Sequence, residues 1–474
     1  MKYLKTITSL GLFTLASFLA GCQADDRAST FDAKGPLARE QLHVFWATVE
    51  VSLLLFVLVG GALAYVLWRY REKEGDEDKP LPEEGHGNPL IEVGLIGFSV
   101  ACLVYIAVPT LKAIWSMNEL EAGFEYTEDR DVLEINVRGY QWWWGFEYVD
   151  YTSPHGEKVV TTGNEFVIPK NKVVKLNLRS DNVIHSFWLP KIAGKVDVMP
   201  GRDNWMWILA EEEGHYYGAC AEYCGEAHAY MYFRCDVVSN EEFDAWMDEL
   251  RSGAPSPLKA AGMPGDWNAF YKLAQEKPEV VEQNAILNGA KLFYGEAGCT
   301  QCHRIDGSQR AESGMLGPNL TNIGSRKTVG AAVLENRRGI DDNWRDILHG
   351  GFDGLNEDEE FSTSTATIDP EIQHGNLVKW IKESHDIKPG NLMYRSVKRE
   401  WTDADKQLLQ KQGKLNWGEQ LQLMESGMMQ NEVSDLTETP FTLDDIERGQ
   451  TVRLTDKDFE DMATYLQTLR VELD

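Results

Sequence analysis

The sequence predicts a multidomain membrane protein: a transmembrane helical hairpin, then an antiparallel β-sandwich or barrel, then a mostly α-helical C-terminal region. Two apolar segments are each long enough to span a bilayer. Apolar and polar residues then alternate with a period of two in short stretches over residues 130–238, which indicates strands. A helical, acidic composition follows to the C-terminus. At 474 residues the chain is too long for one hydrophobic core, which also favours several domains.

The N-terminus has the pattern of a secretory signal. Lys2 and Lys5 precede the apolar run "LGLFTLASFLAGC", which ends in small residues before Cys22. The stretch "LAGC" also resembles a bacterial lipobox. This implies that residues 1–21 are a lipoprotein signal peptide and that Cys22 is acylated, with an ordinary signal and a chance cysteine as the alternative. In both cases residues 22–41 form an extracytoplasmic N-terminal segment.

The two apolar segments, residues 44–68 and 90–115, predict a transmembrane hairpin over residues 42–116. The loop between them, "RYREKEGDEDKPLPEEGHGN", carries basic residues that favour the cytoplasmic side of a bacterial membrane. Both ends of the hairpin then lie outside, and the rest of the chain lies on the outer face. Two core helices of a soluble protein are the alternative, which the segment lengths and the preceding signal disfavour.

The rest of the chain divides where the residue pattern changes. Stretches such as "DVLEINVRGYQWWWGFEY" predict a β-domain over residues 117–240. Residues 241–284 predict a helix, "SNEEFDAWMDELRSG", and a linker, "APSPLKAAGMPGD". A helical domain then covers residues 285–474. The formal net charge of −29 argues against nucleic acid as a partner and favours basic partners or simple solubility.

The stretch "CAEYCGEAHAYM" gathers soft metal ligands: Cys220, Cys224, His228 and Met231. Thiolates and thioethers select copper in soft sites, and imidazole suits copper equally well. His185, in "SDNVIHSFWLP", supplies a second imidazole. Two cysteines, two histidines, one methionine and a backbone carbonyl would serve two copper ions bridged by both sulfurs. The alternatives are zinc, whose structural sites favour a CxxC spacing, and a disulfide between the two cysteines.

These segments resemble a known family. "DNVIHSFWLP", "KVDVMPGR" and "CAEYCGEAHAYM" look like the dinuclear copper (CuA-type) signature of haem–copper oxidase subunit II, and the hairpin and "YQWWWGFEY" fit the same family. The resemblance covers about residues 40–240 and implies a cupredoxin-like β-barrel. It implies that the five side chains named above bind the copper ions together with the backbone carbonyl of Glu222. It also implies that the Glu222 carboxylate reaches a magnesium ion at the contact with subunit I.

Two further residues take roles from the same resemblance. Trp142, in "YQWWWGFEY", matches the residue through which electrons enter the copper centre, whereas Trp143 and Trp144 are interpreted as packing. Glu92, in "HGNPLIEVG", matches the carboxylate that opens a proton path at the start of the second helix. The Trp-Thr and Pro that usually follow this carboxylate are absent. A surface carboxylate at a helix end is therefore the alternative for Glu92.

A second motif, "CTQCH", is the CxxCH pattern of covalent c-type haem attachment. Cys299 and Cys302 would form the two thioether links, and His303 would be the proximal ligand of the haem iron. The surroundings resemble a class I cytochrome c domain whose C-terminal helix is "LTDKDFEDMATYLQTLR". This resemblance implies that the carbonyl of Pro318 orients the histidine and that Met393, in "HDIKPGNLMY", is the sixth ligand.

Insertions at residues 331–385 and 394–453 make this region longer than a minimal cytochrome c, and their function is not predicted. They leave other axial ligands open beside Met393. The competing side chains are Met315, Met424, Met428, Met429, His374 and His385.

Together the resemblances imply the electron-input subunit of a respiratory, proton-translocating cytochrome c oxidase with a fused haem domain. Electrons would pass from an external donor, such as a cytochrome or a quinol-oxidising complex, to the haem and then to the copper pair. They would go on to subunit I, which together with other oxidase subunits would be the partner. The site that reduces oxygen to water would lie in that other chain. The alternatives are the electron-input subunit of a copper-containing nitric oxide reductase, and a membrane-anchored copper-binding or copper-delivery protein.

Overall fold

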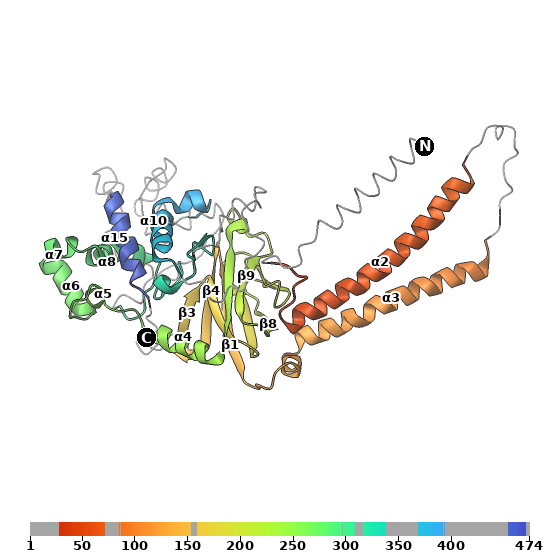
Figure 1. The fold of residues 1–474 in the computed structure, drawn as a ribbon, viewed down its shortest axis with the longest axis horizontal. Helices are drawn as coiled ribbons and strands as arrows, with labels where there is room; N and C mark the ends of the chain where they lie inside the picture. Colours follow the sequence, from red (N-terminus) through yellow and green to blue (C-terminus); the bar gives the residue numbers. More distant parts are fainter. Residues whose placement is uncertain are drawn as a thin grey trace.

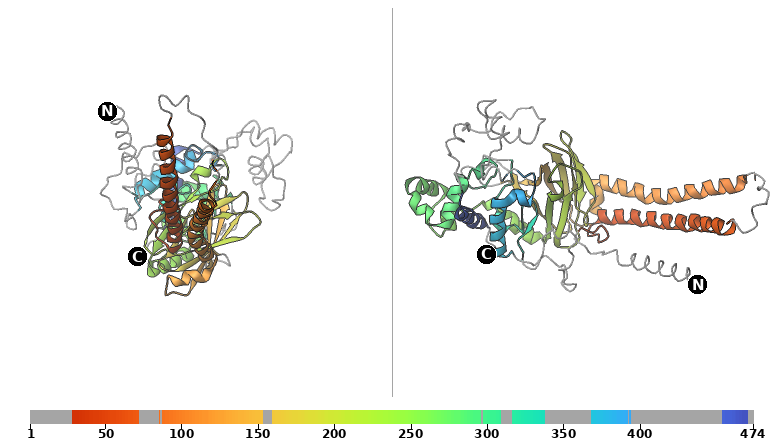
Figure 2. Two further views of the ribbon diagram at one scale, coloured as in Figure 1. Left: turned by 90° about the vertical axis from the view of Figure 1, so that its right-hand side faces the viewer. Right: turned by 90° about the horizontal axis from the view of Figure 1, so that it is seen from above.

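The computed structural model describes these residues of the chain: 28–71, 85, 87–152, 159–295, 297–308, 316–337, 368–391, 393 and 454–470. They form a helical hairpin, a β-sandwich and a helical C-terminal domain, which confirms the predicted fold class (Figure 1). The hairpin and the C-terminal domain lie on opposite sides of the sandwich (Figure 2). The predicted signal peptide, most of both insertions and the following candidate residues lie outside the described residues: Cys22, Met315, Met424, Met428 and Met429.

The hairpin consists of α2 (Pro36–Arg69) and α3 (Pro89–Asn118). Each helix has proline at its first position, where the missing N–H would have no partner inside the helix. Mean hydropathy reaches 2.3 in α2 and 2.2 in α3, and both helices are long and apolar enough to cross a membrane. Most of their apolar side chains are exposed, so the other described residues do not cover them. A bilayer or a partner subunit would cover such a surface.

The sandwich consists of two five-stranded sheets, with strand orders β3-β2-β1-β5-β8 and β4-β10-β9-β6-β7. The strands are β1 (Val132–Tyr140), β2 (Trp143–Thr152), β3 (Val159–Gly163), β4 (Glu165–Pro169), β5 (Val173–Ser180), β6 (His185–Trp188), β7 (Lys195–Val198), β8 (Asn204–Ile208), β9 (Gly214–Cys220) and β10 (Tyr232–Val238). The pairs β1–β5 and β4–β10 are parallel. The predicted antiparallel pairing is therefore wrong for these two pairs, because alternation records which face is buried and not the direction of the neighbouring strand. The short helix η1 (Leu120–Glu125) links the hairpin to this domain.

Aromatic side chains fill the space between the two sheets. Trp144 and Phe146 of β2 face Phe166 of β4, Phe187 of β6 and Phe233 of β10, and all five are fully buried. The rings of Phe146 and Phe166 stack with centroids 4.4 Å apart, as do those of Phe187 and Phe233. Burying one such side chain stabilises the fold by about 1.5–3 kcal/mol. This core holds the sheet that carries the candidate copper ligands.

The C-terminal domain is mostly helical. Helix α4 (Asn240–Ser252) follows the sandwich and packs on its core through Phe243, Met247 and Leu250. The elements of the C-terminal domain are α5 (Pro257–Ala260), α6 (Trp267–Glu276), α7 (Pro278–Glu282), α8 (Ala285–Tyr294), η3 (Cys299–Gln301), η4 (Ile323–Ser325), β11 (Thr328–Val329), β12 (Leu334–Glu335), α10 (Pro370–Ile387) and α15 (Asp456–Gln467). Helix α8 packs on α15 at Gly289, where an added Cβ would lie 2.0 Å from the carbonyl oxygen of Asp461. Leu258, Trp267 and Phe270, from the stretch predicted as helix and linker, pack in the same core as α8.

A polar seam joins the sandwich to the C-terminal domain. The Glu165 carboxylate accepts hydrogen bonds from the backbone N–H groups of Lys327, at 3.1 Å, and Thr328, at 2.7 Å. The Lys327 amino group lies 3.0 Å from a carboxylate oxygen of Asp236. The Arg234 guanidinium donates to the carbonyl of Ala332 at 3.1 Å. Buried charges are costly unless they are paired, so these contacts fix the position of residues 327–332 on the sandwich.

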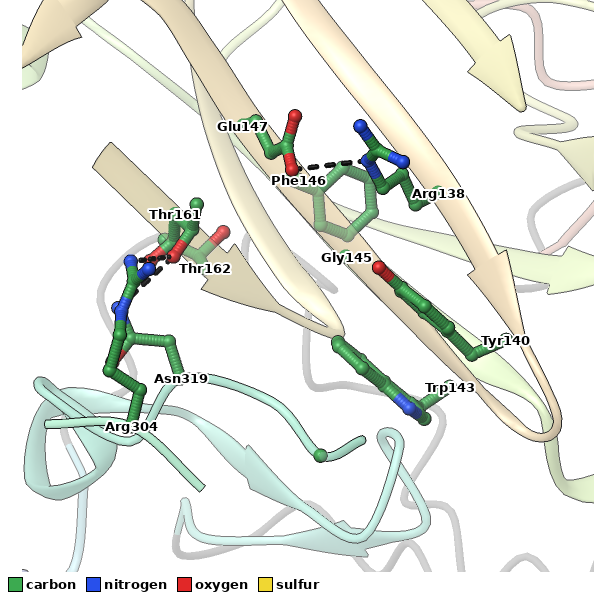
Figure 3. A pocket seen from close by; sticks show the side chains of 11 residues that line it. Arg138, Tyr140, Trp143, Gly145, Phe146, Glu147, Thr161, Thr162, Arg304 and Asn319 are labelled. Atoms are coloured by element: carbon green, nitrogen blue, oxygen red, sulfur yellow. Dashed lines mark hydrogen bonds and ion pairs between the residues drawn. The ribbon is translucent and has the colours of Figure 1, made fainter. Parts of the chain in front are cut away.

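The seam continues beside a small pocket between the two domains (Figure 3). Arg304 donates to the hydroxyl of Thr161 at 2.7 Å, and the Asn319 amide donates to the same hydroxyl at 3.1 Å. On the sandwich side the rings of Tyr140 and Trp143 lie nearly parallel, with centroids 4.3 Å apart. The loop that follows the CxxCH motif therefore lies against the strands that carry the aromatic cluster.

Candidate metal centres

The predicted copper ligands converge on one sheet. His185 begins β6, Cys220 ends β9, and Cys224, His228 and Met231 follow in the loop before β10. The two cysteine sulfurs lie 3.7 Å apart. Cys220 Sγ lies 3.9 Å from His185 Nδ1, whereas Cys224 Sγ lies 3.6 Å from His228 Nδ1 and 3.8 Å from Met231 Sδ. The fold thus brings together side chains that are up to 46 positions apart in the sequence, as the positions of His185 and Met231 show.

Glu222 presents its backbone and its side chain in different directions. Its carbonyl oxygen lies 3.2 Å from Cys220 Sγ, while its side chain is exposed. The predicted carbonyl ligand therefore lies next to the Cys220 sulfur, and the residue remains exposed.

This donor set fits two copper ions better than the alternatives. The two cysteines are free thiols in the centre, with His185 and the Glu222 carbonyl next to Cys220 and with His228 and Met231 next to Cys224. One tetrahedral zinc would use four ligands and leave two of these donors without a role. A disulfide would need the sulfurs at about 2.05 Å. Soft sulfur and imidazole donors in two groups around a shared pair of sulfurs match the preference of copper.

Neighbouring groups set the orientation of His185. An added Cβ at Gly139 of β1 would lie 2.8 Å from the imidazole ring, so a larger residue there would displace it. The side-chain oxygen of Asn182 lies 3.2 Å from Nε2 of His185, which leaves Nδ1 facing the sulfurs. Sequence reasoning missed both positioning residues. The isolated glycine within a strand pattern was the available signal for a close approach.

The two copper-site thiols titrate as a pair. A hydrogen bond with Cys224 is the main reason that the pKa of Cys220 is lowered to about 3. A hydrogen bond with His185 also lowers this pKa, whereas burial raises it. The hydrogen bond between the two cysteines, together with burial, raises the pKa of Cys224. Cys220 therefore loses its proton more readily than Cys224, and metal binding to both sulfurs would displace the remaining proton.

Trp142 lies directly against the copper loop. Its indole Nε1 donates to the backbone carbonyl of Cys224 at 3.0 Å, and the Gln141 amide donates to the same carbonyl at 2.8 Å. An added Cβ at Gly225 would lie 3.0 Å from the indole ring. By contrast, Trp143 stacks on Tyr140, as described above, and Trp144 is buried in the core. Trp142 therefore contacts the copper loop through a hydrogen bond, and its role in electron entry stays a prediction.

The CxxCH motif lies at η3, directly after α8. His303 Nδ1 lies 2.9 Å from the carbonyl oxygen of Pro318, the predicted orienting partner, which leaves Nε2 for a metal. An added Cβ at Gly317 would lie 2.6 Å from the His303 ring. Burial lowers the pKa of His303 and raises the pKa of Cys299 to about 12 and that of Cys302 to about 11. The hydrogen bond to Pro318 and the close approach of Gly317 hold the His303 ring in one orientation, which fits an imidazole that binds a haem iron.

The candidate sixth ligand, Met393, packs against the same C-terminal core as Cys299. Its backbone N–H donates to the side-chain oxygen of Asn391 at 2.9 Å, which fixes the start of its loop. Its competitor His374 faces α15: one ring nitrogen lies 3.2 Å from the Thr464 hydroxyl and the other lies 3.5 Å from the Glu460 carboxylate. These contacts occupy both nitrogens of His374, which favours Met393.

Glu92 lies in the first turn of α3 and is exposed. An added Cβ at Gly87 would lie 2.1 Å from one of its carboxylate oxygens, so the carboxylate folds back over the start of the helix. A negative charge is stabilising at a helix N-terminus. This position supports the surface role, and the proton role stays a prediction.

Comparisons with known proteins match most of the chain. A family model described as "Cytochrome C oxidase subunit II, periplasmic domain" matches residues 133–238. The chain is 29% identical over 394 residues to "Cytochrome c oxidase subunit 2" of Alkalihalophilus pseudofirmus, covering 83% of this chain and 93% of that protein. It is 30% identical over 263 residues to "Probable cytochrome c oxidase subunit 2" of Rickettsia bellii, covering 52% of this chain and 93% of that protein.

Among solved structures, the chain is similar to the crystal structure of the periplasmic domain of subunit II of cytochrome oxidase of Bradyrhizobium japonicum. The sequence identity is 34%, the match covers 25% of this chain and 94% of that chain, and the TM-score is 0.23. The Alkalihalophilus protein is similar over a longer part of the chain than the Rickettsia protein, and this longer match extends beyond the sandwich.

Proposed function

The chain belongs to the cytochrome c oxidase subunit 2 family, and from this premise we propose the path by which electrons cross it. It is the electron-input subunit of a haem–copper oxidase, an oxidoreductase complex whose subunit I and other subunits are its partners. The hairpin α2–α3 anchors it in the membrane, with the copper domain outside. The oxygen chemistry belongs to another chain of the complex.

In this proposal, two copper ions bind between the sulfurs of Cys220 and Cys224. His185, His228, Met231 and the backbone carbonyl of Glu222 complete the ligand set. The observation that carries the proposal is that all six donor atoms already gather with neighbouring distances of 3.2 to 3.9 Å. When bound, such a pair stores and releases one electron. The residues around it exclude water, because Cys220, Cys224 and Met231 are buried.

The C-terminal domain carries one c-type haem in this proposal. Cys299 and Cys302 attach it, His303 binds its iron from one side in the orientation set by Pro318, and Met393 binds from the other side. Two observations support this: the His303–Pro318 hydrogen bond, and the similarity to the Alkalihalophilus protein, which extends beyond the sandwich. Electrons pass from an external donor, a cytochrome or a quinol-oxidising complex, to this haem. They pass on to the copper pair through Trp142, whose indole donates to the carbonyl of Cys224.

Three further assignments belong to the same proposal. The exposed carboxylate of Glu222 holds a magnesium ion at the contact with subunit I. Acylated Cys22 adds a lipid anchor to the hairpin. Glu92 matches the proton-path carboxylate by position alone, since the residues that usually follow it are absent and its carboxylate folds back over the start of α3. Each of these follows from the family resemblance of its motif.

The test is purification of the intact complex, followed by metal analysis, optical spectroscopy and turnover assays. We expect two copper ions with a mixed-valence dinuclear signal and one covalently bound haem for each copy of this chain. Oxygen consumption without comparable nitric oxide reduction is the expected activity. A single, easily removed copper ion would favour a delivery protein, and turnover with nitric oxide alone would favour a nitric oxide reductase.

A further inference from the structure

We propose that Lys388 is a positioning residue for electron transfer between the two metal centres, holding the segment 388–393 on Trp142. The inference rests on the proposed function, since it takes Met393 as a haem ligand and Cys224 as a copper ligand. The transfer itself moves one electron: the haem iron is oxidised by one electron and the copper pair is reduced by one, with no proton transferred.

Lys388 lies directly after α10 and is only 4% exposed. Its side-chain amino group donates to the backbone carbonyl of Trp142, on the sandwich. Lysine is almost never fully buried unless it is paired, because removing the amino group from water is costly. Burial lowers the pKa of Lys388 to about 7, and the amino group can donate this hydrogen bond in both protonation states. The buried amine is thus used to join the two domains.

A second contact lies two residues further along the segment. Gly390 has a φ of +83°, and an added Cβ there would lie 3.0 Å from a carboxylate oxygen of Glu226 and 3.1 Å from its β-carbon. Glu226 belongs to the copper loop, between Cys224 and His228. Any larger residue at position 390 would push the segment away from the copper loop. Gly390 therefore lies against the copper loop, and this contact does not depend on the Lys388 side chain.

These contacts form a continuous chain of hydrogen bonds between the two proposed metal ligands. The N–H of Met393 donates to the side chain of Asn391 at 2.9 Å, and the N–H of Asn391 donates to the carbonyl of Lys388 at 3.2 Å. The Lys388 amine then donates to the carbonyl of Trp142, whose indole donates to the carbonyl of Cys224 at 3.0 Å. Electron tunnelling weakens steeply across space that no bond or hydrogen bond spans. Lys388 supplies the link in this chain that crosses between the domains.

The test compares three variants in the intact oxidase complex. Lys388→Met removes the donor and keeps a long side chain, whereas Lys388→Arg keeps a donor. Lys382→Met is the matched control, because Lys382 lies on α10, is partly exposed and pairs with Asp456 inside the C-terminal domain. Metal content and the haem and copper spectra should match the parent protein in all three variants, since none of the changes removes a proposed ligand.

The first measurement is amide hydrogen exchange at Gly390, Asn391 and Met393, which reports on docking of the segment without any turnover. In Lys388→Met we expect exchange to accelerate roughly tenfold, as for loss of one buried hydrogen bond. The second is the rate of copper reduction after flash reduction of the haem. It should fall by roughly tenfold or more, because small displacements of reacting groups have large effects on rate. Lys388→Arg should restore both values, and Lys382→Met should change neither.

Parent-like exchange and a parent-like transfer rate in Lys388→Met would overturn the positioning role. A slower rate with unchanged exchange would also overturn it, since the segment would then be docked without Lys388. Failure of the proposed function would look different, because the parent protein itself would lack one of the two centres or would not transfer electrons from haem to copper.

Discussion

The copper site and the haem site are built in different ways. The copper donors come from the ends of two neighbouring strands and one short loop, so the hydrogen bonds of one sheet hold them in place. The haem residues come from three separate places: Cys299–His303, Gly317–Pro318 and Met393. Their positions depend on helix packing and on the polar seam. The copper site should therefore persist without its metal, whereas the C-terminal domain should depend on the group that its segments enclose.

The largest effect is expected from the double variant Cys299→Ala and Cys302→Ala. Without covalent attachment, the free energy of unfolding of the C-terminal domain should fall by about 4 kcal/mol. This is the stabilisation expected from a ligand present at about a thousand times its dissociation constant. Limited proteolysis should then cut within residues 285–474 while the sandwich stays intact. If the C-terminal domain of the variant resists the protease as well as that of the parent protein, its stability does not depend on the attached group.

His215 lies at the seam beside Asp236. We expect this residue to change the free energy of unfolding with pH by about 3 kcal/mol. Burial lowers the pKa of His215 from 6.5 to about 4, despite the attraction of Asp236. Its Nε2 has no hydrogen-bond partner among the described residues, so the neutral ring is favoured. Lys327 and Arg337 also face it and oppose protonation.

Because the folded protein resists protonating His215, stability from this group is present above pH 6.5. It is lost as the pH falls from 6.5 towards 4, at up to about 1.4 kcal/mol per pH unit. Urea unfolding at several pH values should therefore show a shallower acid slope for His215→Leu than for the parent. Equal slopes in the two proteins would refute the assignment.

Met393→Ala should lower the free energy of unfolding by about 2 kcal/mol, because a partly buried methionine contributes less to stability than a fully buried one. The haem should stay attached through Cys299 and Cys302, but the low-spin spectrum of methionine ligation should disappear. An unchanged spectrum and potential would assign the sixth ligand to a different side chain.

The smallest effect on folding is expected from Cys220→Ser, with a loss of about 1 kcal/mol or less. The dinuclear copper signal should be lost, whereas circular dichroism should still report the folded sandwich, since the sheets and not the metal hold this site. Unfolding of the sandwich on removal of copper would show that both sites depend on their bound group, which would contradict this expectation.

The proximity of the candidate copper ligands could be predicted from sequence because four of the five side chains lie in one short motif. The position of Gly139 could not, because β1 and β6 belong to different sheets and Gly139 meets His185 only where these sheets pack together, which alternation does not encode. The contact of Asn182 with His185, three residues away, depends on the local turn before β6. The burial of Lys388 could not be predicted from the sequence either. One lysine in a loop is ordinarily a surface residue, and its burial depends on how two domains meet.

The polar seam also changes the kinetic order of the proposed electron transfer. A mobile carrier must find its acceptor by diffusion, steered by surface charges that salt screens. Here Glu165, Asp236 and Arg234 already hold the donor domain on the acceptor domain through contacts that are largely buried. The encounter becomes intramolecular, with an effective concentration set by the chain instead of by the solution. Transfer from haem to copper should therefore be first-order, with a rate independent of protein concentration and only weakly sensitive to ionic strength.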